Sequence, residues 1–314
     1  MRVVGSGALN LDLFYEVEDL KAIDPRLEPG RELWGSREEL WTLRERLEKR
    51  GRFLTSSGGG SAANTIYALS SWGFKTAFIG VVGEDEEGAQ VMAELKGVDL
   101  SRVKRKGHTA CSLIILDAQR DRAIFVSPGS HEKQISALVP AQTSREEWLH
   151  LSSLISEEGF AFHLQLKKQH QGPFSLDPGE IYAQKGLKKL YPLLSQADLL
   201  FITRQELEML GGDLPFLRQK VKRICLKRGA QGAIIYDDQP FEISPVPATS
   251  IVDNTGAGDV FDAGVIAGLL SGLTLKAAGE LAASLAALSL RDYGRRGYPS
   301  REEFIQRRNQ YDNT

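Results

Sequence analysis

Cysteine and long apolar runs are both scarce in this sequence. Cys111 and Cys225 are the only cysteines among the 314 residues, and each lies in an apolar stretch with no neighbour at metal-ligand spacing. We therefore expect two buried free thiols, not a disulfide or a metal pair. The longest apolar stretches, such as residues 263–270, are far shorter than the about 20 residues of a membrane-spanning helix. These scarcities predict a soluble, cytoplasmic protein with no membrane partner.

An excess of charge of either sign is also missing. Lys and Arg number 39 against 41 Asp and Glu, which leaves a net charge of −2. A nucleic-acid partner is therefore not expected, because such proteins normally carry a basic excess on one face. The arginines near the carboxyl end are interleaved with acidic residues, which favours an ordinary solvated helix; they are Arg291, Arg295, Arg296, Arg301, Arg307 and Arg308.

Two common nucleotide-binding motifs are absent or incomplete. The P-loop pattern Gly-x-x-x-x-Gly-Lys-Ser/Thr does not occur. Residues 5–10 come close to the dinucleotide fingerprint Gly-x-Gly-x-x-Gly, so an NAD-dependent oxidoreductase is one alternative. Asn10 stands in place of the third glycine, and residues 11–17 have the pattern of a strand where the fingerprint requires a helix. Both departures argue against that alternative.

Most of the chain alternates between strand-like and helical patterns. Strands are predicted at residues 2–7, 75–83, 173–177, 198–202, 223–227 and 233–236, and helices at 61–72, 183–194, 205–210, 256–270 and 275–290. Such alternation is typical of a mainly parallel sheet covered by helices on both faces. Two segments differ. Residues 110–126 are expected to form a hairpin, and residues 36–50 a capped amphipathic helix with Leu40, Leu43 and Leu47 on one side.

The most informative segment is residues 253–264, Asp-Asn-Thr-Gly-Ala-Gly-Asp-Val-Phe-Asp-Ala-Gly. Its glycines precede a helical run, so bare backbone N–H groups are expected at a helix start, where phosphate oxygens bind. Asp259 would project from the first turn. There a carboxylate can accept the proton of a hydroxyl that attacks a phosphoryl group. Taken alone, Asp259 is better explained as an acidic residue favoured by the helix dipole. We expect Asp262 to be a surface or packing residue.

The same segment closely resembles the carboxyl-terminal signature of the ribokinase-like (PfkB) carbohydrate kinase family, Asp-Thr-Thr-Gly-Ala-Gly-Asp-x-Phe. Only Asn254 departs from it. The resemblance implies that Asp259 is the catalytic base and that residues Gly256, Ala257 and Gly258 form the anion hole. It also implies an α/β fold of three layers, α/β/α, with a mainly parallel central sheet and a small β lid.

A second glycine motif supports this resemblance. Residues 58–64, Gly-Gly-Gly-Ser-Ala-Ala-Asn, are similar to the family's amino-terminal Gly-Gly motif, whose backbone and Asn contact the acceptor. An Asn-x-Asp sequence follows the first predicted strand, as in family members, and a carboxylate there can accept hydrogen bonds from two neighbouring hydroxyls. The residues implied to bind the acceptor are Asn10, Asp12, Gly59, Gly60 and Asn64.

Two further stretches resemble the family's nucleotide side. Residues 197–206 are similar to a strand that ends in Asn-x-x-Glu, with Thr203 in place of Asn, and residues 227–232 are similar to the nucleotide loop. The resemblance implies ATP contacts from Thr203, Lys227, Gly229 and Gly232. It also implies a Mg²⁺ site organised by Glu206, Asp253 and Thr255. ATP and Mg²⁺ are thus the expected cofactors, with room for a monovalent cation such as K⁺.

Together these features predict an ATP-dependent kinase that transfers the γ-phosphate to a hydroxyl of a sugar. A nucleoside kinase of the same family is the main alternative. A non-catalytic sugar-binding relative is a further one, although retention of Asp259 and of both glycine motifs argues against it. A phosphorylated sugar would need Lys or Arg near the lid, for which the candidates are Arg102, Lys104, Arg105 and Lys106.

We expect one domain of residues 1–314 with lid segments inserted at about 13–57 and 108–127. The first insert contains the amphipathic helix at residues 36–50, which must bury its apolar side. We predict that this helix packs on its own lid, or on the lid of a second copy in a homodimer. A helix lying on the main body is the alternative.

Overall fold

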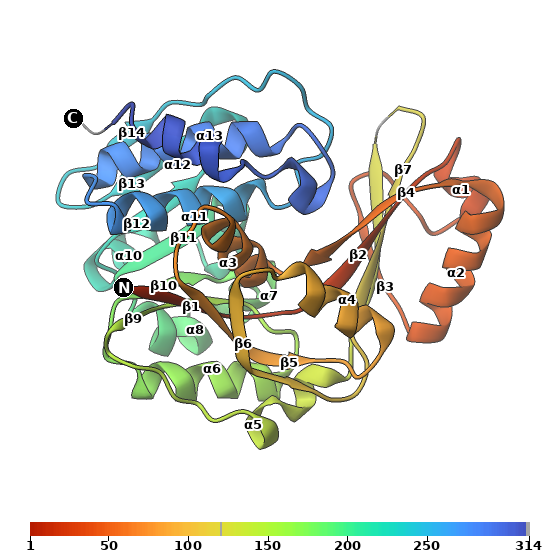
Figure 1. The fold of residues 1–314 in the computed structure, drawn as a ribbon, viewed down its shortest axis with the longest axis horizontal. Helices are drawn as coiled ribbons and strands as arrows, with labels where there is room; N and C mark the ends of the chain where they lie inside the picture. Colours follow the sequence, from red (N-terminus) through yellow and green to blue (C-terminus); the bar gives the residue numbers. More distant parts are fainter. Residues whose placement is uncertain (120, 312–314) are drawn as a thin grey trace.

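A nine-stranded sheet forms the centre of the computed structural model, which describes residues 1–119 and 121–311 (Figure 1). Its order is β14-β13-β12-β11-β10-β9-β1-β5-β6, and neighbours from β12 to β6 are parallel, whereas β13 and β14 pair antiparallel. The strands are β1 Arg2–Ser6, β5 Thr76–Val82, β6 Val98–Arg105, β9 Glu147–Ser152, β10 Phe174–Asp177, β11 Leu199–Thr203, β12 Ile224–Lys227, β13 Ala233–Tyr236 and β14 Phe241–Ile243. The predicted α/β class and mainly parallel sheet are confirmed.

Helices cover both faces of this sheet, because successive strand residues enter opposite cores. Val3 belongs to one hydrophobic cluster and Val4 to the other. The cluster that contains Val3 includes residues from α3 Ser61–Ser71, α4 Glu86–Glu94, α11 Ala257–Leu270, α12 Leu275–Ser289 and α13 Arg301–Arg308. The cluster that contains Val4 includes residues from α5 Ile135–Leu138, α6 Glu157–Gln169, α7 Gly179–Ala183, α8 Gly186–Leu194, α9 Arg204–Leu210 and α10 Leu214–Lys220. Short 3₁₀ helices lie at His131–Gln134, Gly229–Gln231 and Gly294–Gly297.

Two predictions about individual elements need correction. The helix expected at residues 183–194 is two helices, α7 and α8, with Gly186 at a positive φ of 77° at the start of the second. The arginines near the carboxyl end do not all lie on a solvated helix, because Arg295 belongs to a 3₁₀ turn and is only 5% exposed. The two cysteines are buried and free, as predicted. Within the described residues, none of the helices has the length and apolar character to cross a membrane.

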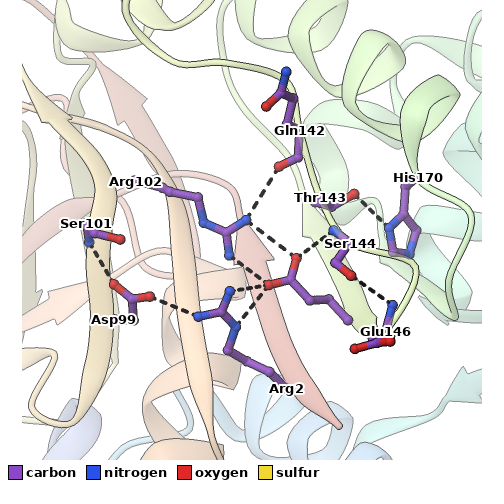
Figure 2. Close-up of polar contacts among 10 residues, drawn as sticks. Arg2, Asp99, Ser101, Arg102, Gln142, Thr143, Ser144, Glu146 and His170 are labelled. Atoms are coloured by element: carbon purple, nitrogen blue, oxygen red, sulfur yellow. Dashed lines mark hydrogen bonds and ion pairs between the residues drawn. The ribbon is translucent and has the colours of Figure 1, made fainter.

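A cluster of ion pairs stabilises the edge of the sheet at which β1 and β9 begin (Figure 2). Arg2 bonds Asp99 of β6 at 3.0 Å and Glu147 of β9 at 2.9 Å, and Arg102 bonds the same Glu147 at 3.2 Å. Arg102 is therefore already paired there. The opposite edge holds the carboxyl ends of the strands, where open α/β sheets bind ligands. Asp177, Thr203 and Lys227 are the last residues of β10, β11 and β12 at that edge.

The lid is a separate five-stranded sheet beside the main body, on the right in Figure 1. Its order is β3-β8-β7-β2-β4, with β3 Glu32–Trp34, β8 Arg122–Ser127, β7 Ala110–Leu116, β2 Asn10–Glu16 and β4 Arg52–Gly59. β7 and β8 pair antiparallel, as the predicted hairpin requires. Alternating β2 residues face opposite sides, so Leu13 and Tyr15 enter the lid core while Asp12 belongs to the other face.

Helices α1 Leu20–Ile23 and α2 Arg37–Arg50 cover the side of the lid away from the main body (Figure 1). Ser36 and Glu39 form the capping box that begins α2, as the sequence predicts. Leu40, Leu43 and Leu47 are at most 2% exposed and share a core with Leu13 and Phe125 of the lid strands. The helix thus packs on its own lid, which is one of the two predicted arrangements, and not on the main body.

Candidate active site

The signature loop ends in the first turn of α11, with Gly256 as its N-cap residue. Gly256 has a φ of 78°, and a Cβ there would lie 2.1 Å from the Tyr298 hydroxyl oxygen, so only glycine fits. Ala257 and Gly258 are the first two helical residues, and Asp259 is the third. The N–H groups of a first turn have no partner within their helix. This turn can therefore donate to an anion, with the Asp259 carboxylate beside it.

Asp259 is half-buried and held by two side chains of α3. Ser61 Oγ donates to Oδ1 at 2.6 Å, and Asn64 Nδ2 donates to Oδ2 at 2.8 Å. Burial raises the pKa of Asp259 to about 6, and the two hydrogen bonds and Lys227 oppose part of that rise. A carboxylate with this pKa is mostly ionised at neutral pH and has a proton affinity suited to a general base. Its two oxygens keep lone pairs for a further donor.

The predicted acceptor residues of the amino-terminal segment lie together where β2 pairs with the end of β4. Asn10 Nδ2 donates to Asp12 Oδ1 at 2.7 Å. A Cβ on Gly59 would lie 2.4 Å from Asp12 Oδ2, so glycine allows this close approach. Gly60 has a φ of 95°, and a Cβ there would lie 1.9 Å from the Ala8 carbonyl oxygen. Both glycines of the motif are thus required by the backbone path.

Asp12 is a buried carboxyl group on the inner face of the lid, and its side chain is 9% exposed or less. Burial raises the pKa of Asp12 from 3.8 to about 7, against hydrogen bonds from Ser112 and Asn10 and the charge of Arg295. A buried carboxylate of this kind gains from every hydroxyl that donates to it. The site is chemically suited to a ligand that presents neighbouring hydroxyl groups.

Arg295 is a residue of this site that the sequence interpretation missed. Its Nε donates to Asn64 Oδ1 at 2.9 Å, its NH2 to the Gly59 carbonyl oxygen at 3.4 Å, and its backbone N–H to Ser57 Oγ at 3.2 Å. The guanidinium also lies 5.1 Å from the ring centre of Tyr67. No local pattern distinguishes Arg295 from Arg291 or Arg296, because its burial depends on a contact more than 200 residues away.

The nucleotide-side residues surround a cavity of about 230 Å³ at the carboxyl ends of β11 and β12. Its lining residues are Thr203, Arg204, Gln205, Lys227, Arg228, Gly229 and Gln231. Gly229 and Gly232 have positive φ angles of 56° and 80°, and a Cβ on Gly232 would lie 2.1 Å from the Ile243 carbonyl oxygen. A larger hollow of about 530 Å³ contains Ile224 and Tyr236, at the other end of β12 and β13, and none of the predicted site residues.

Thr203 and Glu206 form a reciprocal cap at the start of α9. Thr203 Oγ1 accepts from the Glu206 N–H at 3.2 Å, and Glu206 Oε2 accepts from the Thr203 N–H at 2.7 Å. Thr and Asn both serve as N-cap residues, so Thr203 can take the place that Asn has in the family pattern without loss of this turn. Burial raises the pKa of Glu206, with a smaller contribution from Asp177.

Lys227 connects the nucleotide cavity to the signature helix. Its Nζ bonds Asp177 Oδ2 at 2.8 Å and Asp262 at 3.2 Å, and it lies 3.5 Å from where a Cβ on Gly258 would be. Burial raises the pKa of Asp262 well above its ordinary value, whereas Lys227 holds that of Asp177 below its own. Asp262 was expected to be a surface or packing residue; it is fully buried and bonds Lys227, so the surface alternative is wrong and the packing alternative holds.

The lid reaches the signature loop through Arg122 of β8. Its NH1 donates to Asn254 Oδ1 at 2.6 Å and to Thr255 Oγ1 at 3.1 Å. Asp253 Oδ1 accepts from both the backbone and the hydroxyl of Thr255, and Oδ2 accepts from the Gly294 N–H at 2.9 Å. Asn254, the one departure from the family signature, is therefore one of the residues that contact the lid.

A protein-only metal cage is not found in residues 1–119 and 121–311, where no group of three or more His, Cys, Asp or Glu side chains is placed to hold an ion. The metal residues predicted from the resemblance have partners within the protein. Glu206 caps α9, and Asp253 and Thr255 bond each other. Their oxygens suit a hard cation such as Mg²⁺, which normally keeps several waters and binds substrate phosphates. Their metal roles stay a prediction.

Comparison with known proteins assigns most of the chain to one family. The model of the pfkB family carbohydrate kinases matches residues 31–301. A protein of Archaeoglobus fulgidus described as an uncharacterized sugar kinase is 32% identical over 246 residues, which cover 74% of this chain and 98% of that protein.

Two solved structures show the same fold. A probable sugar kinase from Rhizobium etli superposes with a TM-score of 0.82 at 21% identity, over 97% of each chain. The nucleoside kinase of Methanocaldococcus jannaschii, described as an archaeal member of the ribokinase family, superposes with a TM-score of 0.77 at 20% identity, over 98% of each chain.

Proposed function

Because the chain belongs to the pfkB family of carbohydrate kinases, and is therefore a phosphotransferase that acts on a sugar or nucleoside with ATP, we propose that it phosphorylates a sugar hydroxyl with Asp259 as the general base. The observation that carries this proposal is the position of Asp259. Its half-buried carboxylate has a pKa of about 6 and lies in the first turn of the signature helix. Its two supporting side chains come from the helix that follows the Gly-Gly motif.

The acceptor binds between the lid and the signature helix in this proposal. Asn10, Asp12 and the backbone of the Gly-Gly motif bind its hydroxyls, with Asn64 at the edge of the site. Asp12 accepts hydrogen bonds from two neighbouring hydroxyls, which offsets the penalty of its burial. This arrangement directs a further hydroxyl toward Asp259.

Transfer then needs little more than alignment and charge stabilisation. The acceptor oxygen forms a bond to the γ-phosphorus of ATP, and the bond from that phosphorus to the β,γ-bridging oxygen breaks. The hydroxyl proton passes to Asp259, and ADP leaves. The N–H groups of the Gly256–Gly258 turn stabilise the charge on the transferred group. Lys227 adds positive charge behind this turn.

ATP is proposed to occupy the cavity lined by Thr203, Lys227 and Gly229, because its phosphates would then point toward the signature helix. When bound, Mg²⁺ neutralises phosphate charge. Glu206, Asp253 and Thr255 would hold it mainly through water and phosphate oxygens. A monovalent cation such as K⁺ near the signature loop remains a prediction.

A nucleoside is the second candidate acceptor. Phe14 lies two residues after Asp12 on the same face of β2, and its ring centre is 5.6 Å from that of Tyr293. An aromatic pair beside a hydroxyl-binding carboxylate suits a ribose that carries a base. Sugar and nucleoside kinases both occur among the relatives. A phosphorylated sugar would find Arg122 at the signature loop, where it bonds Asn254 and Thr255, whereas Arg102 is paired with Glu147.

The homodimer through the lid and the cytoplasmic location also stay predictions. The apolar side of α2 is buried within its own lid, so the argument for a dimer from that side no longer applies. Light scattering of the purified protein measures its mass directly.

A phosphorylation screen tests the proposed function. The protein would be incubated with ATP, Mg²⁺ and single sugars, sugar phosphates or nucleosides, and ADP and phosphorylated product would both be measured. We expect equimolar ADP and product with a sugar, and formation of both at least about 10²-fold slower with the Asp259→Asn variant. Product only with nucleosides would transfer the assignment to the second candidate. No product from any class would contradict the proposal.

A further inference from the structure

The amide of Asn64 lies between two groups of opposite hydrogen-bonding character. Its Oδ1 accepts from Arg295 Nε at 2.9 Å, and its Nδ2 donates to Asp259 Oδ2 at 2.8 Å. A guanidinium can only donate, and an ionised carboxylate can only accept. Only one of the two amide orientations satisfies both neighbours, so these neighbours fix the orientation of the amide.

Arg295 is itself held on several sides, so it can serve as a fixed support. Its backbone N–H and its NH2 group bond Ser57 and the Gly59 carbonyl, which belong to the lid strand that leads into the Gly-Gly motif. Its side chain is only 4% exposed. Its NH1 has no hydrogen-bond partner in the described residues and lies 3.9 Å from Glu94 Oε2.

Burial of a guanidinium beside a catalytic site needs a compensating gain, because such a charge loses its hydration. Stability alone is a poor explanation, since NH1 is left without a hydrogen bond and the ion pair with Glu94 is long. The interaction of Arg295 with Asn64 supplies a functional explanation for this burial. Without Arg295, the amide could turn its oxygen toward Asp259 and repel the carboxylate that it now holds.

We propose that Arg295 is a positioning residue of the phosphoryl-transfer site, whose Nε–H fixes the amide of Asn64 so that Asn64 holds the Asp259 carboxylate toward the acceptor hydroxyl. This inference rests on the proposed role of Asp259 as the base. Arg295 contacts neither the acceptor nor ATP in this account, and it acts through Asn64. It also joins the end of the lid strand to the base, since the same guanidinium bonds the Gly59 carbonyl.

The charged and titratable groups around the two ends of this chain of bonds are few. Those that face Asp259 are Asp177, Lys227, Asp262 and Tyr298, and those that face Arg295 are Asp12, Glu94, Tyr67 and Tyr298. Arg295 is not among the main causes of the raised pKa of Asp259, whereas the hydrogen bond from Asn64 lowers that pKa. A change at Arg295 should therefore reach Asp259 through the Asn64 amide.

Three variants and one control test the inference: Arg295→Met, Arg295→Lys, Asn64→Ala, and Arg296→Met. Arg296 is the exposed neighbour, and its NH2 group lies 3.2 Å from Asp292 Oδ2. Loss of the Asn64 bond should raise the pKa of Asp259 from about 6 toward about 7, since a hydrogen bond to a charged group is worth about one pKa unit or more. The acid limb of the kcat–pH profile should move upward by the same amount.

We expect Arg295→Met to lower kcat by about 10²-fold, the usual cost of a misplaced catalytic group, with a much smaller change in the acceptor KM. Arg295→Lys keeps the charge but not the Nε–H, so it should also lower kcat and raise the pKa of Asp259. This variant keeps the test possible if Arg295→Met does not fold. A double variant that combines a substitution of Arg295 with Asn64→Ala should have no higher Asp259 pKa than Asn64→Ala alone. Arg296→Met should match the wild type.

A direct NMR titration of the Asp259 carboxyl carbon, assigned by its absence in Asp259→Asn, gives a readout that does not depend on turnover. An unchanged pKa of Asp259 in a folded Arg295→Lys protein would overturn the positioning role. Additive pKa changes in the double variant would overturn the route through Asn64. An unmodified wild type without kinase activity would instead contradict the proposed function, and the titration would still decide the role of Arg295.

Discussion

Replacement of Asp12 by Asn should stabilise the protein at alkaline pH, although Asp12 is proposed to bind the acceptor. The folded structure raises the pKa of Asp12 from 3.8 to about 7 because the carboxyl group is buried. Between these two values the folded state binds more protons than the unfolded state, so the contribution of Asp12 to stability falls as the pH rises through this range. Asn keeps the shape of the side chain but not the charge.

The magnitude follows from the two pKa values. One pKa unit corresponds to about 1.4 kcal/mol. Relative to a side chain that does not titrate, the raised pKa of Asp12 therefore lowers the free energy of unfolding by about 4 kcal/mol at pH 8 and by about 2 kcal/mol at pH 5. The stability gained by Asp12→Asn should therefore be larger at pH 8 than at pH 5 by about 2–3 kcal/mol. Side-chain contacts that do not depend on pH contribute equally at both pH values, so their contribution cancels when the two free energies are subtracted.

Urea unfolding of both proteins at pH 5 and pH 8 measures this difference. Asp24→Asn is a matched control on the same lid, because Asp24 is buried but its pKa is lowered, chiefly by a hydrogen bond from Arg26. Its stabilising contribution is present throughout pH 5–8, so this variant should lose the same stability at both values. An Asp12→Asn effect that does not grow between pH 5 and pH 8 would refute the reasoning.

Three further predictions concern the nucleotide, the metal and the lid. Lys227→Met should weaken ATP binding at least about tenfold in calorimetry and leave acceptor binding within about twofold. The reason is that the substitution leaves Asp177 and the signature turn without their cation. Equal losses for both ligands would be inconsistent with Lys227 on the nucleotide side of the site. Kinase activity should disappear when a chelator removes Mg²⁺, yet the nucleotide-free protein should bind Mg²⁺ only at about millimolar concentrations. Tight binding of Mg²⁺ to the nucleotide-free protein would contradict this prediction. Leu40→Asp should lower the free energy of unfolding by about 3 kcal/mol or more and weaken acceptor binding, because it places a charge in the core of the lid. An unchanged acceptor affinity would contradict a role of the lid in acceptor binding.

Much of the fold was predictable because its signals are local. One glycine of each motif is required by a positive φ angle and a close approach, Gly60 against the Ala8 carbonyl and Gly256 against Tyr298. The capping box at Ser36 and Glu39 depends on residues three apart. The alternation of strands and helices likewise appears in short windows of sequence.

The rest depends on contacts between distant segments. Asp262 was interpreted as a surface or packing residue because nothing near it indicates a partner, yet Lys227 lies 35 positions away and beside it in space. Arg295 has the same local surroundings as its exposed neighbours and differs only in meeting Asn64, 231 positions away. The amphipathic pattern of α2 shows that one side is buried, but not which surface covers it.

The central claim is that Asp259 removes the proton of the acceptor hydroxyl. The most direct measurement is single-turnover phosphoryl transfer from γ-labelled ATP to an accepted substrate, with wild type and Asp259→Asn compared at saturating ligand. Asn keeps the shape of the side chain and one of the two hydrogen bonds that Asp259 accepts, but it is not a base. The account therefore predicts a loss of about 10²–10⁴-fold in transfer rate, with ATP affinity within about threefold in calorimetry. A transfer rate within tenfold of the wild type would contradict it.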